Sequence, residues 1–507
     1  MQIHEPISSS PQPSPFFMPA AIKQIRRLII PENSTSLPRS QSKICDGRFY
    51  PRMSKTTTGP GERPSVRTSS SLSAQMLPYA AQRSNSSMAR VDSSYVPVLE
   101  SKSVVVIDFG SRYTRIGFGG EFYPREALRS EVVDPETNEV KPLFAVGRSD
   151  EEDRRILHLF FRKIFFKLVS SYRSLFSQCF FRYLLCSVKE RRILIVESIL
   201  TPTKKRQQIA SVLFETATFS PPAILFAPSH LLQTIPFSIN SALIVDVGFS
   251  ETLLVPIYEG VTMLNKYECS PVCSESLEKR IGTLLRKHGH IKMENGGTRD
   301  ITEEDLALMT EMNIIEDIAV RFCFATKMER GCKIQDENVD FELAIACPIG
   351  FLKEIVVVPG IIRESAAELF FAPSHCEDDR SVSELILDSI IKLPIDMRRP
   401  MISNIVVVGG AARIPGFLAR LKSEIMWLLQ KDERYGFLHK LAESVKFFVY
   451  SEAPVELYGA WLGGSLLATL DVMQSKSLTH EEWLKKDKKV PDWTEKIDEY
   501  FKLEKEN

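Results

Sequence analysis

The chain has 507 residues, of which 44% are hydrophobic and 25% are charged, a composition typical of a globular protein with more than one domain. Its 64 basic and 64 acidic residues give a net charge of zero, so the charge balance does not favour nucleic acid or an anionic membrane as a partner. Nine cysteines without a Cys-x-x-Cys pair indicate reduced thiols in a cytosolic protein and exclude a zinc-ribbon pattern.

Residues 1–98 are rich in Ser, Pro, Thr and Arg, are poor in acidic residues, and have no sustained hydrophobic period. Such a segment cannot bury enough apolar surface to offset the entropy of ordering, so we predict a disordered extension. The same composition also satisfies the loose description of an organelle transit peptide. Met53 and Met88 are alternative start positions.

The stretch Val104–Glu121 predicts a tight hairpin, because an aliphatic run ends at Asp108 and a second apolar run follows a short turn. Gly110 would let the backbone approach an anion, and Ser111 could donate a hydrogen bond to it. Arg115 could neutralise a phosphate, and Asp108 could hold the accompanying divalent cation through water. Taken alone, the pattern is more typical of an ordinary β-hairpin than of a phosphate site.

The next segment, residues 125–155, is short and separates the hairpin from a helical stretch. Residues 156–185 are the most apolar tract, but five Lys and Arg residues exclude a membrane span. Phe161, Phe165, Leu168 and Tyr172 fall on one face of a helix, which indicates core packing. Residues 167–181 are either part of this helix, an insertion or an artefact of the gene sequence.

A helix is predicted over Thr203–Thr216, with a basic, solvated beginning. Beyond the short strand that follows, His230 is expected to be a satisfied structural residue. Residues 274–286 and 302–328 have helical spacing, and the stretch His288–Asp300 between them reads as a polar loop. Residues 339–358 read as short strands.

Two later stretches repeat the plan of the first hairpin. Ala242–Gly260 contains an aliphatic strand, then Asp246 and Gly248, then a returning strand. Asn404–Gly416 contains a third aliphatic strand that ends in Gly409 and Gly410, before a helix predicted to begin near Pro415.

Two Asp-Gly hairpins followed by a strand-Gly-Gly-helix turn resemble the phosphate loops and adenosine loop of the actin, sugar-kinase and heat-shock-70 ATPase fold. The runs at Val255–Gly260, Leu385–Gly410, Ile414–Ile425 and Tyr458–Leu470 resemble actin-related proteins within that group. The implied fold class is α/β, with two lobes of mixed sheets and flanking helices around a nucleotide cleft.

The resemblance also implies a domain plan. The first lobe covers about 102–245 together with the C-terminal helices at about 455–480, and the second lobe covers about 246–454. Residues 125–155 would form a shortened version of the subdomain that, in an actin, protrudes at the pointed end.

Within the actin family, the runs Glu190–Leu200, Ile224–Leu232, Phe324–Gln335 and Val490–Trp493 resemble the subunit at the pointed end of dynactin. This implies a non-motile structural subunit that caps the short actin-related filament and supports dynein-based transport along microtubules. The implied partners are the filament subunits and the other pointed-end subunits, and indirectly dynein and cargo adaptors. The implied location is the cytoplasm and its cytoskeleton.

For the cleft, the resemblance implies ATP or ADP with Mg held through water by Asp108 and Asp246. The phosphates would lie against Gly110, Ser111, Arg115 and Gly248, and the nucleoside against the Gly409–Gly410 turn. An empty cleft is the alternative.

A residue-by-residue comparison with actin implies that this chain has apolar residues in place of the family's catalytic groups. The water-positioning glutamine falls on Pro222 and the histidine of the second loop on Leu253. The polar groups around the nucleoside fall on Ala319, Val320 and Leu457. We therefore expect no catalytic residue and no enzyme activity.

Two other functions stay open. One is an active ATPase or phosphotransferase of the same fold, against which the apolar replacements count. The other is a nuclear actin-related subunit of a chromatin-remodelling complex, against which the absence of a basic excess counts.

Overall fold

The computed structural model describes residues 103–166, 184, 186–335, 341, 345–348, 354–372, 380–449, 453–485 and 488–490. The predicted extension at 1–98, the segment 167–181 and most of the Val490–Trp493 run lie outside these residues. Within the described residues, no helix combines the length and the apolar character that crossing a membrane requires.

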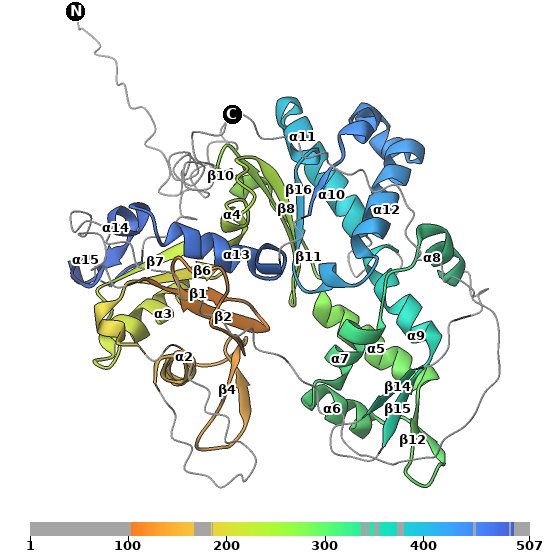
Figure 1. The fold of residues 1–507 in the computed structure, drawn as a ribbon, viewed down its shortest axis with the longest axis horizontal. Coiled ribbons are helices and arrows are strands. Elements are labelled where there is room, and N and C mark those ends of the chain that lie inside the picture. The colour runs from red at the N-terminus through yellow and green to blue at the C-terminus, as the bar shows by residue number, and fades with distance from the viewer. Residues whose placement is uncertain are drawn as a thin grey trace, which may run out of the picture. The chain divides into compact units, whose positions relative to one another are not determined.

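The first sheet has six strands in the order β18-β7-β6-β1-β2-β3 (Figure 1). Their bounds are Leu478–Thr479, Ala223–Pro228, Ile193–Glu197, Val105–Phe109, Tyr113–Phe118 and Glu126–Arg129. Strand β1 is antiparallel to β2 and parallel to β6, which is parallel to β7. The C-terminal ends of β1, β6 and β7 therefore meet at one edge of the sheet.

The second sheet repeats this topology. Its path runs β10-β9-β8-β16-β17, and β11 also pairs with β9. The bounds are Val261–Thr262, Thr252–Tyr258, Ala242–Val247, Ile405–Val408 and Phe447–Phe448, with β11 at Glu268–Ser270. Like β1, strand β8 has an antiparallel neighbour, β9, on one side and a parallel neighbour, β16, on the other. Because β8 belongs to this sheet, the second lobe begins slightly earlier than the predicted residue 246.

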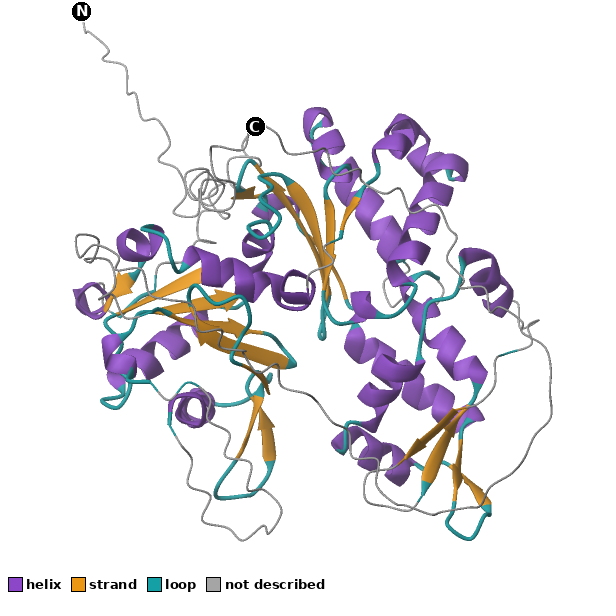
Figure 2. Ribbon diagram, in the orientation of Figure 1, coloured by secondary structure: helices purple, strands orange, loops and turns teal. Residues whose placement is uncertain are grey.

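Helices cover both faces of each sheet (Figure 2). On the first sheet, Val105 and Ile107 pack toward α2, at Asp150–Phe165, and α3, at Thr203–Glu215. The opposite face packs against α4, at Ser229–Gln233, and α13, at Ala453–Leu467, in a core that also includes β8 and β16. Strands buried on both faces read as continuous aliphatic runs, which explains the pattern of β1.

The far face of the second sheet packs on a larger helical layer. This layer contains α5 (Ser274–His288), α7 (Ile314–Phe322), α9 (Gly360–Ser365), α10 (Val382–Ile391) and α12 (Phe417–Lys431). The remaining α-helices of the described residues are α6 (Glu303–Glu311), α8 (Met328–Gln335), α11 (Ile395–Ile402), α14 (Val472–Lys476) and α15 (His480–Lys485). The helix after the Gly-Gly turn thus begins at Phe417, close to the predicted Pro415.

A smaller sheet, in the order β13-β12-β15-β14, corrects one prediction. Strands β12, at His290–Lys292, and β13, at Thr298–Asp300, form a hairpin where the sequence indicated a polar loop. Strands of three residues are too short to produce a visible alternation of polar and apolar residues. Strands β14, at Ile345–Pro348, and β15, at Ile355–Val358, confirm the strands predicted in this region.

The C-terminal helix α13 is joined to the first sheet through Trp461. Its indole is fully buried, and its Nε1 donates to the carbonyl of Val106 on β1 at 3.3 Å. A Cβ placed on Gly117 would lie 2.6 Å from the indole ring, so β2 leaves the space that the ring fills. Trp461 is therefore a core residue and not part of an exposed surface.

Replacing Trp461 with Ala should lower the free energy of unfolding by about 3–5 kcal/mol, because a large fully buried ring and its hydrogen bond are lost. Denaturant titration measures this change. Trp427→Ala is the matched control, because that ring is 47% exposed, and it should change stability by about 1 kcal/mol or less. Equal effects of the two substitutions would contradict the assignment of Trp461 to the core.

Candidate functional site: a cleft at the ends of two sheets

A cavity of about 360 Å³ lies at the C-terminal ends of the central strands of the two similar sheets. All eight predicted binding residues line it, namely Asp108, Gly110, Ser111, Arg115, Asp246, Gly248, Gly409 and Gly410. Its volume is within the range of small-molecule sites, about 300–1,000 Å³. The structure thus brings the three sequence motifs together around one space.

The two hairpin turns close in the same way. The amide of Gly110 donates to the carbonyl of Tyr113 at 3.2 Å, and the amide of Gly248 donates to the carbonyl of Glu251 at 3.0 Å. Each turn follows a strand that ends beside an aspartate, which is buried at Asp108 and partly exposed at Asp246. The repeated topology therefore places Asp108 and Asp246 in equivalent positions.

Asp108 differs from Asp246 in having an arginine in direct contact, although the charge of Arg115 also acts on Asp246. The Arg115 guanidinium lies directly across the β1–β2 ladder, and its Nη1 donates to Asp108 Oδ2 at 3.1 Å. Burial raises the pKa of Asp108, while Arg115 acts to lower it. The structure pairs Arg115 with Asp108 at the cavity, and its contact with a phosphate stays a prediction.

Leu253 occupies the same cross-strand position opposite Asp246. Because that neighbour is apolar, no cation from β9 compensates the Asp246 carboxylate. Burial raises the pKa of Asp246 to about 6, and the nearby Glu251 carboxylate adds to the increase. The cleft therefore holds an excess of acidic groups that a bound cation would stabilise.

Gly409 allows the Gly409–Gly410 turn to pack closely against the hairpin that carries Asp246. It has a φ of +96°, and a Cβ there would lie 2.7 Å from Asp246 Oδ1 and 2.2 Å from the carbonyl oxygen of Val247. Only glycine accepts this conformation and this approach without strain. The Gly409–Gly410 turn thus forms a wall of the cavity immediately beside Asp246.

The comparison with actin assigned the water-positioning glutamine to Pro222. This assignment is wrong, because Pro222 does not lie at the cleft. Pro222 precedes β7 and accepts a hydrogen bond from the amide of His480, at the end of the strand far from the cleft. Because β7 is parallel to β6 and β1, its C-terminal end faces the cavity. Ser229 and His230 follow that end and line the cavity.

His230 is also not the satisfied structural residue that the sequence indicated. It is 2% exposed, and its Nε2 lies 3.8 Å from Asp246 Oδ2, beyond hydrogen-bond distance. Burial lowers the pKa of His230 to about 4, so the imidazole is neutral near pH 7. Its role depends on the direction of β7, which the local sequence does not encode.

The residues at the far end of the cavity are mostly apolar. Ala319, Val320 and Leu457 line it, as the sequence comparison implied, and Arg413 pairs there with Glu456. The residues present thus fit a phosphate group with a divalent cation at the Asp108–Asp246 end. They offer fewer polar groups to a nucleoside at the other end.

Sequence reasoning missed a cluster of ion pairs that we call the latch, formed by Arg112, Tyr113 and Arg129 from the first lobe and Glu278 and Glu316 from the second. Arg112 Nη2 lies 2.9 Å from Glu316 Oε2 and 3.4 Å from Glu278 Oε1. The hydroxyl of Tyr113 donates to Glu316 Oε1 at 2.7 Å, and Arg129 also pairs with Glu316. Burial alone would raise the pKa of Glu316, but these donors lower it.

The latch also involves the second hairpin turn. The Arg112 guanidinium lies 4.5 Å from the centroid of the Phe249 ring, a cation–π distance. Arg112, Tyr113, Phe249, Glu278 and Glu316 all line the cavity. The latch therefore joins the two lobes at the cleft through protein side chains alone.

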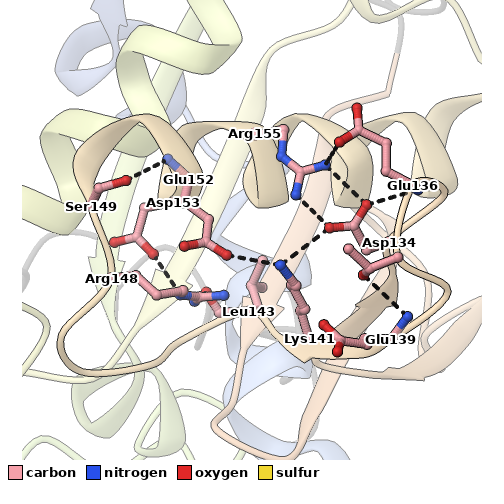
Figure 3. Close-up of polar contacts among 11 residues, drawn as sticks. Asp134, Glu136, Glu139, Lys141, Leu143, Arg148, Ser149, Glu152, Asp153 and Arg155 are labelled. Carbon is pink, nitrogen blue, oxygen red and sulfur yellow. Dashed lines mark hydrogen bonds and ion pairs between the residues drawn. The ribbon is translucent and has the colours of Figure 1, made fainter.

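A second feature is the segment at residues 125–155, for which the resemblance to actins predicts a shortened protrusion. Its two short strands, β4 at Glu131–Val133 and β5 at Val140–Pro142, form a hairpin beside α2. Asp134, whose side chain is fully buried, accepts from Arg155 Nη1 of α2 at 3.0 Å and pairs with Lys141 at 3.2 Å (Figure 3). The hydrogen bonds from Arg155 are the main reason that the pKa of Asp134 lies far below its usual range.

Further pairs hold the same hairpin and the start of α2. Lys141 also pairs with Glu152 at 3.0 Å, and Arg148 pairs with Asp153 at 3.1 Å (Figure 3). The Ser149 hydroxyl accepts from the amide of Glu152 and caps α2. The hairpin is thus fixed to the helix and not extended away from it.

Two similar sheets, each with an aspartate at a glycine turn beside a shared cleft, define the actin-like class of two-lobed proteins. A family model described as Actin matches residues 99–491 of the chain. The chain belongs to the actin family. It is similar to a protein of Dictyostelium discoideum called Actin-related protein 10, with 28% identity over 441 residues, which cover 78% of this chain and 90% of that protein.

Replacing Glu316 with Gln should weaken the latch, because one carboxylate accepts hydrogen bonds from three donors. We expect a loss of about 1–2 kcal/mol of stability, allowing for partial solvent screening, and faster amide exchange in α7 and at Tyr113. Hydrogen exchange followed by mass spectrometry measures both. Glu304→Gln, at an exposed position of α6, is the control, and identical exchange in the two variants would refute the latch.

Replacing Asp134 with Asn should release the β4–β5 hairpin, because Arg155 and Lys141 lose the charge that holds them. We expect faster exchange of the amides of Asn138 and Glu139 and a Tm lower by a few degrees. Glu136→Gln is the matched control, since that side chain is 79% exposed. Unchanged exchange at the hairpin would show that the ion pairs do not hold it.

Proposed function

We propose that the protein is a non-motile structural subunit that caps the pointed end of the short actin-related filament of dynactin and so supports dynein-based transport along microtubules. Its partners would be the filament subunits and the other pointed-end subunits, and indirectly dynein and cargo adaptors. It would act in the cytoplasm, as part of the cytoskeleton.

The observation that carries this proposal is the β4–β5 hairpin. In an actin-like filament, the corresponding protrusion reaches the next subunit. Here its strands have three residues each, and Asp134 and Lys141 tie it to α2. A subunit with an intact two-lobed core and a short, fixed protrusion can join a filament at one end and offers little to a further subunit at the other.

The geometry of filaments supports this reasoning. Subunits of a filament associate head to tail, so each uses two different surfaces. A subunit in which only one of these surfaces is changed can still bind the filament end but cannot bind a further subunit, so growth stops there. The similarity to Actin-related protein 10 over most of both chains is consistent with a specialised member of the family.

We further propose that the cleft holds ATP or ADP with Mg as a structural ligand. Asp108 and Asp246 would hold the cation through water, and the turns at Gly110–Ser111, Gly248 and Gly409–Gly410 would contact the phosphates. The bound group would supply positive charge between the two carboxylates and would join the lobes. Our support is the acidic excess at Asp246 and the glycine turns around the cavity.

The proposal assigns no catalytic residue to the chain. Leu253 and Phe249 are apolar groups at the phosphate end of the cavity, where hydrolysis would need groups that orient water and accept its proton. An ATPase of the same fold is the second candidate, because Ser229 and His230 supply polar groups beside Asp246 that the sequence comparison had missed.

Capping is tested by mixing labelled protein with preformed actin-related filaments and imaging single filaments. We expect label at one end of each filament and no polymer of the protein alone, under conditions in which actin polymerises. Label along the filament sides, or long filaments of the protein by itself, would overturn the proposal.

A further inference from the structure

The turn after β2 presents two neighbouring aromatic side chains to solvent. Phe122 is 69% exposed, more than any other aromatic side chain of the described residues, and Tyr123 is 56% exposed. A single exposed apolar residue is ordinary on a protein surface, but two large rings next to each other are not. Neither residue belongs to a hydrophobic core or lines the cleft. Folding and the cleft therefore do not explain the pair.

The backbone of this turn is fixed from two sides. On α13, the Ser465 hydroxyl donates to the carbonyl of Glu121 at 2.7 Å and accepts from the amide of Gly120 at 3.0 Å. Within the turn, the Glu121 carboxylate accepts from the amide of Phe118 at 3.1 Å and from Arg125 Nε at 2.7 Å. A surface that is ordered before binding loses little conformational entropy when a partner docks on it.

Two guanidinium groups lie beside the aromatic pair. Arg125 and Arg191 contact the ring of Phe118, at 5.4 and 5.1 Å from its centroid, and the Arg125 side chain is 57% exposed. Among the described residues, Glu121 is the one carboxylate that pairs with either guanidinium. Two cations against one carboxylate leave an excess of one positive charge. We call this surface the aromatic corner, and it consists of Phe118, Phe122, Tyr123, Arg125 and Arg191.

The aromatic corner is separate from the cleft and from the β4–β5 hairpin. It lies where β1 begins and β2 ends, since the amide of Gly119 donates to the carbonyl of Val104 at 2.8 Å. The first turn, which lines the cleft, joins the opposite ends of these two strands. The hairpin also starts at that opposite end, where the amide of Ser130 donates to the carbonyl of Arg112 at 3.0 Å. A partner on the aromatic corner would therefore leave the cleft and the hairpin uncovered.

We propose that the aromatic corner is a docking surface for another protein, through a segment in which an apolar side chain stands next to an aspartate or glutamate. The apolar side chain would pack on Phe122 and Tyr123, and the carboxylate would pair with Arg125. Aromatic and arginine side chains are the types most enriched among the residues that dominate binding between proteins. A second copy of this chain would bring the same positive charge to the contact, so the charge favours a different, acidic partner.

The identity of the partner rests on the proposed function, within which the occupant is one of the other pointed-end subunits of dynactin. The test measures binding of these purified subunits, without the filament, to the full-length protein by calorimetry. The double variant Phe122→Ala, Tyr123→Ala should bind about tenfold or more weakly, because both aromatic anchors are removed. Unchanged affinity of this variant, or no binding by the wild type, would overturn the inference.

Phe437→Ala is the matched control for the aromatic substitutions. Its ring is 59% exposed and lies on the second lobe, so the affinity should stay at the wild-type value. An equal loss of affinity in this control would show a general effect of removing exposed rings and would overturn the assignment of the surface.

Arg125→Gln tests the carboxylate of the partner. This variant should bind more weakly than the wild type at low salt, and the difference should shrink at high salt, because salt screens the contact between exposed charges. A difference that does not change with salt would overturn the pairing of Arg125 with a carboxylate.

Measurements on the protein alone separate docking from other roles of the aromatic corner. The double variant should keep the wild-type Tm within about 2 °C, since exposed side chains contribute little to stability. A Tm lower by several degrees would show a structural role. Faster amide exchange at Phe122 and Tyr123 after deletion of residues 1–98 would show that the chain's own N-terminal segment covers the surface. A dimer that the double substitution dissociates would show a second copy, and each of these three results would overturn the inference.

Labelling of filament ends distinguishes this inference from capping. The double variant should label one end of actin-related filaments as the wild type does. Loss of end labelling in the variant alone would show that the aromatic corner binds the filament, and would overturn the assignment to a different subunit. If the wild type binds the other pointed-end subunits but labels no filament end, capping fails and the docking surface stands.

Discussion

The pair of carboxylates at Asp108, which is buried, and Asp246, which is partly exposed to the cleft, is the constraint on which the site depends. Two sheets of the same topology each carry an aspartate to a shared cleft, where burial raises the pKa of both. One is compensated by Arg115, while the other faces Leu253 across its ladder. Closing the lobes around this charge costs free energy unless a cation or another group balances it.

The latch supplies part of the closing force without involving either aspartate. Arg112 and Tyr113 belong to the first turn and the start of β2, and both contact Glu316. The residues on the two sides of the turn therefore act differently. Those before it bring negative charge into the cleft, and those after it bind Glu316 on the other lobe. The latch therefore holds the lobes together against the repulsion between the acidic groups of the cleft, and a bound metal-nucleotide would reduce that repulsion.

The sequence predicted what local patterns encode. Both hairpins and the Gly-Gly turn are short strand–turn units, and all eight residues predicted from them line the cleft. It did not predict the latch, because Tyr113 and Glu316 are 203 positions apart and nothing near either residue indicates the other. His230 was misjudged for a related reason, since its place depends on the direction of β7 in the sheet. The glutamine position was assigned to Pro222 because the comparison with actin followed residue types and did not consider which end of β7 faces the cleft.

If the protein is the terminal subunit proposed above, the latch and the fixed hairpin would serve one physical need of that position. A subunit inside a filament is supported by neighbours at both ends, whereas a terminal subunit has a neighbour at one end only. Its closed form must then rest on its own contacts or on a bound ligand. Here Glu316 joins the lobes, and Asp134 ties the β4–β5 hairpin to α2, so ion pairs within the chain hold both parts. A chain built this way can end a filament without needing the next subunit to order it.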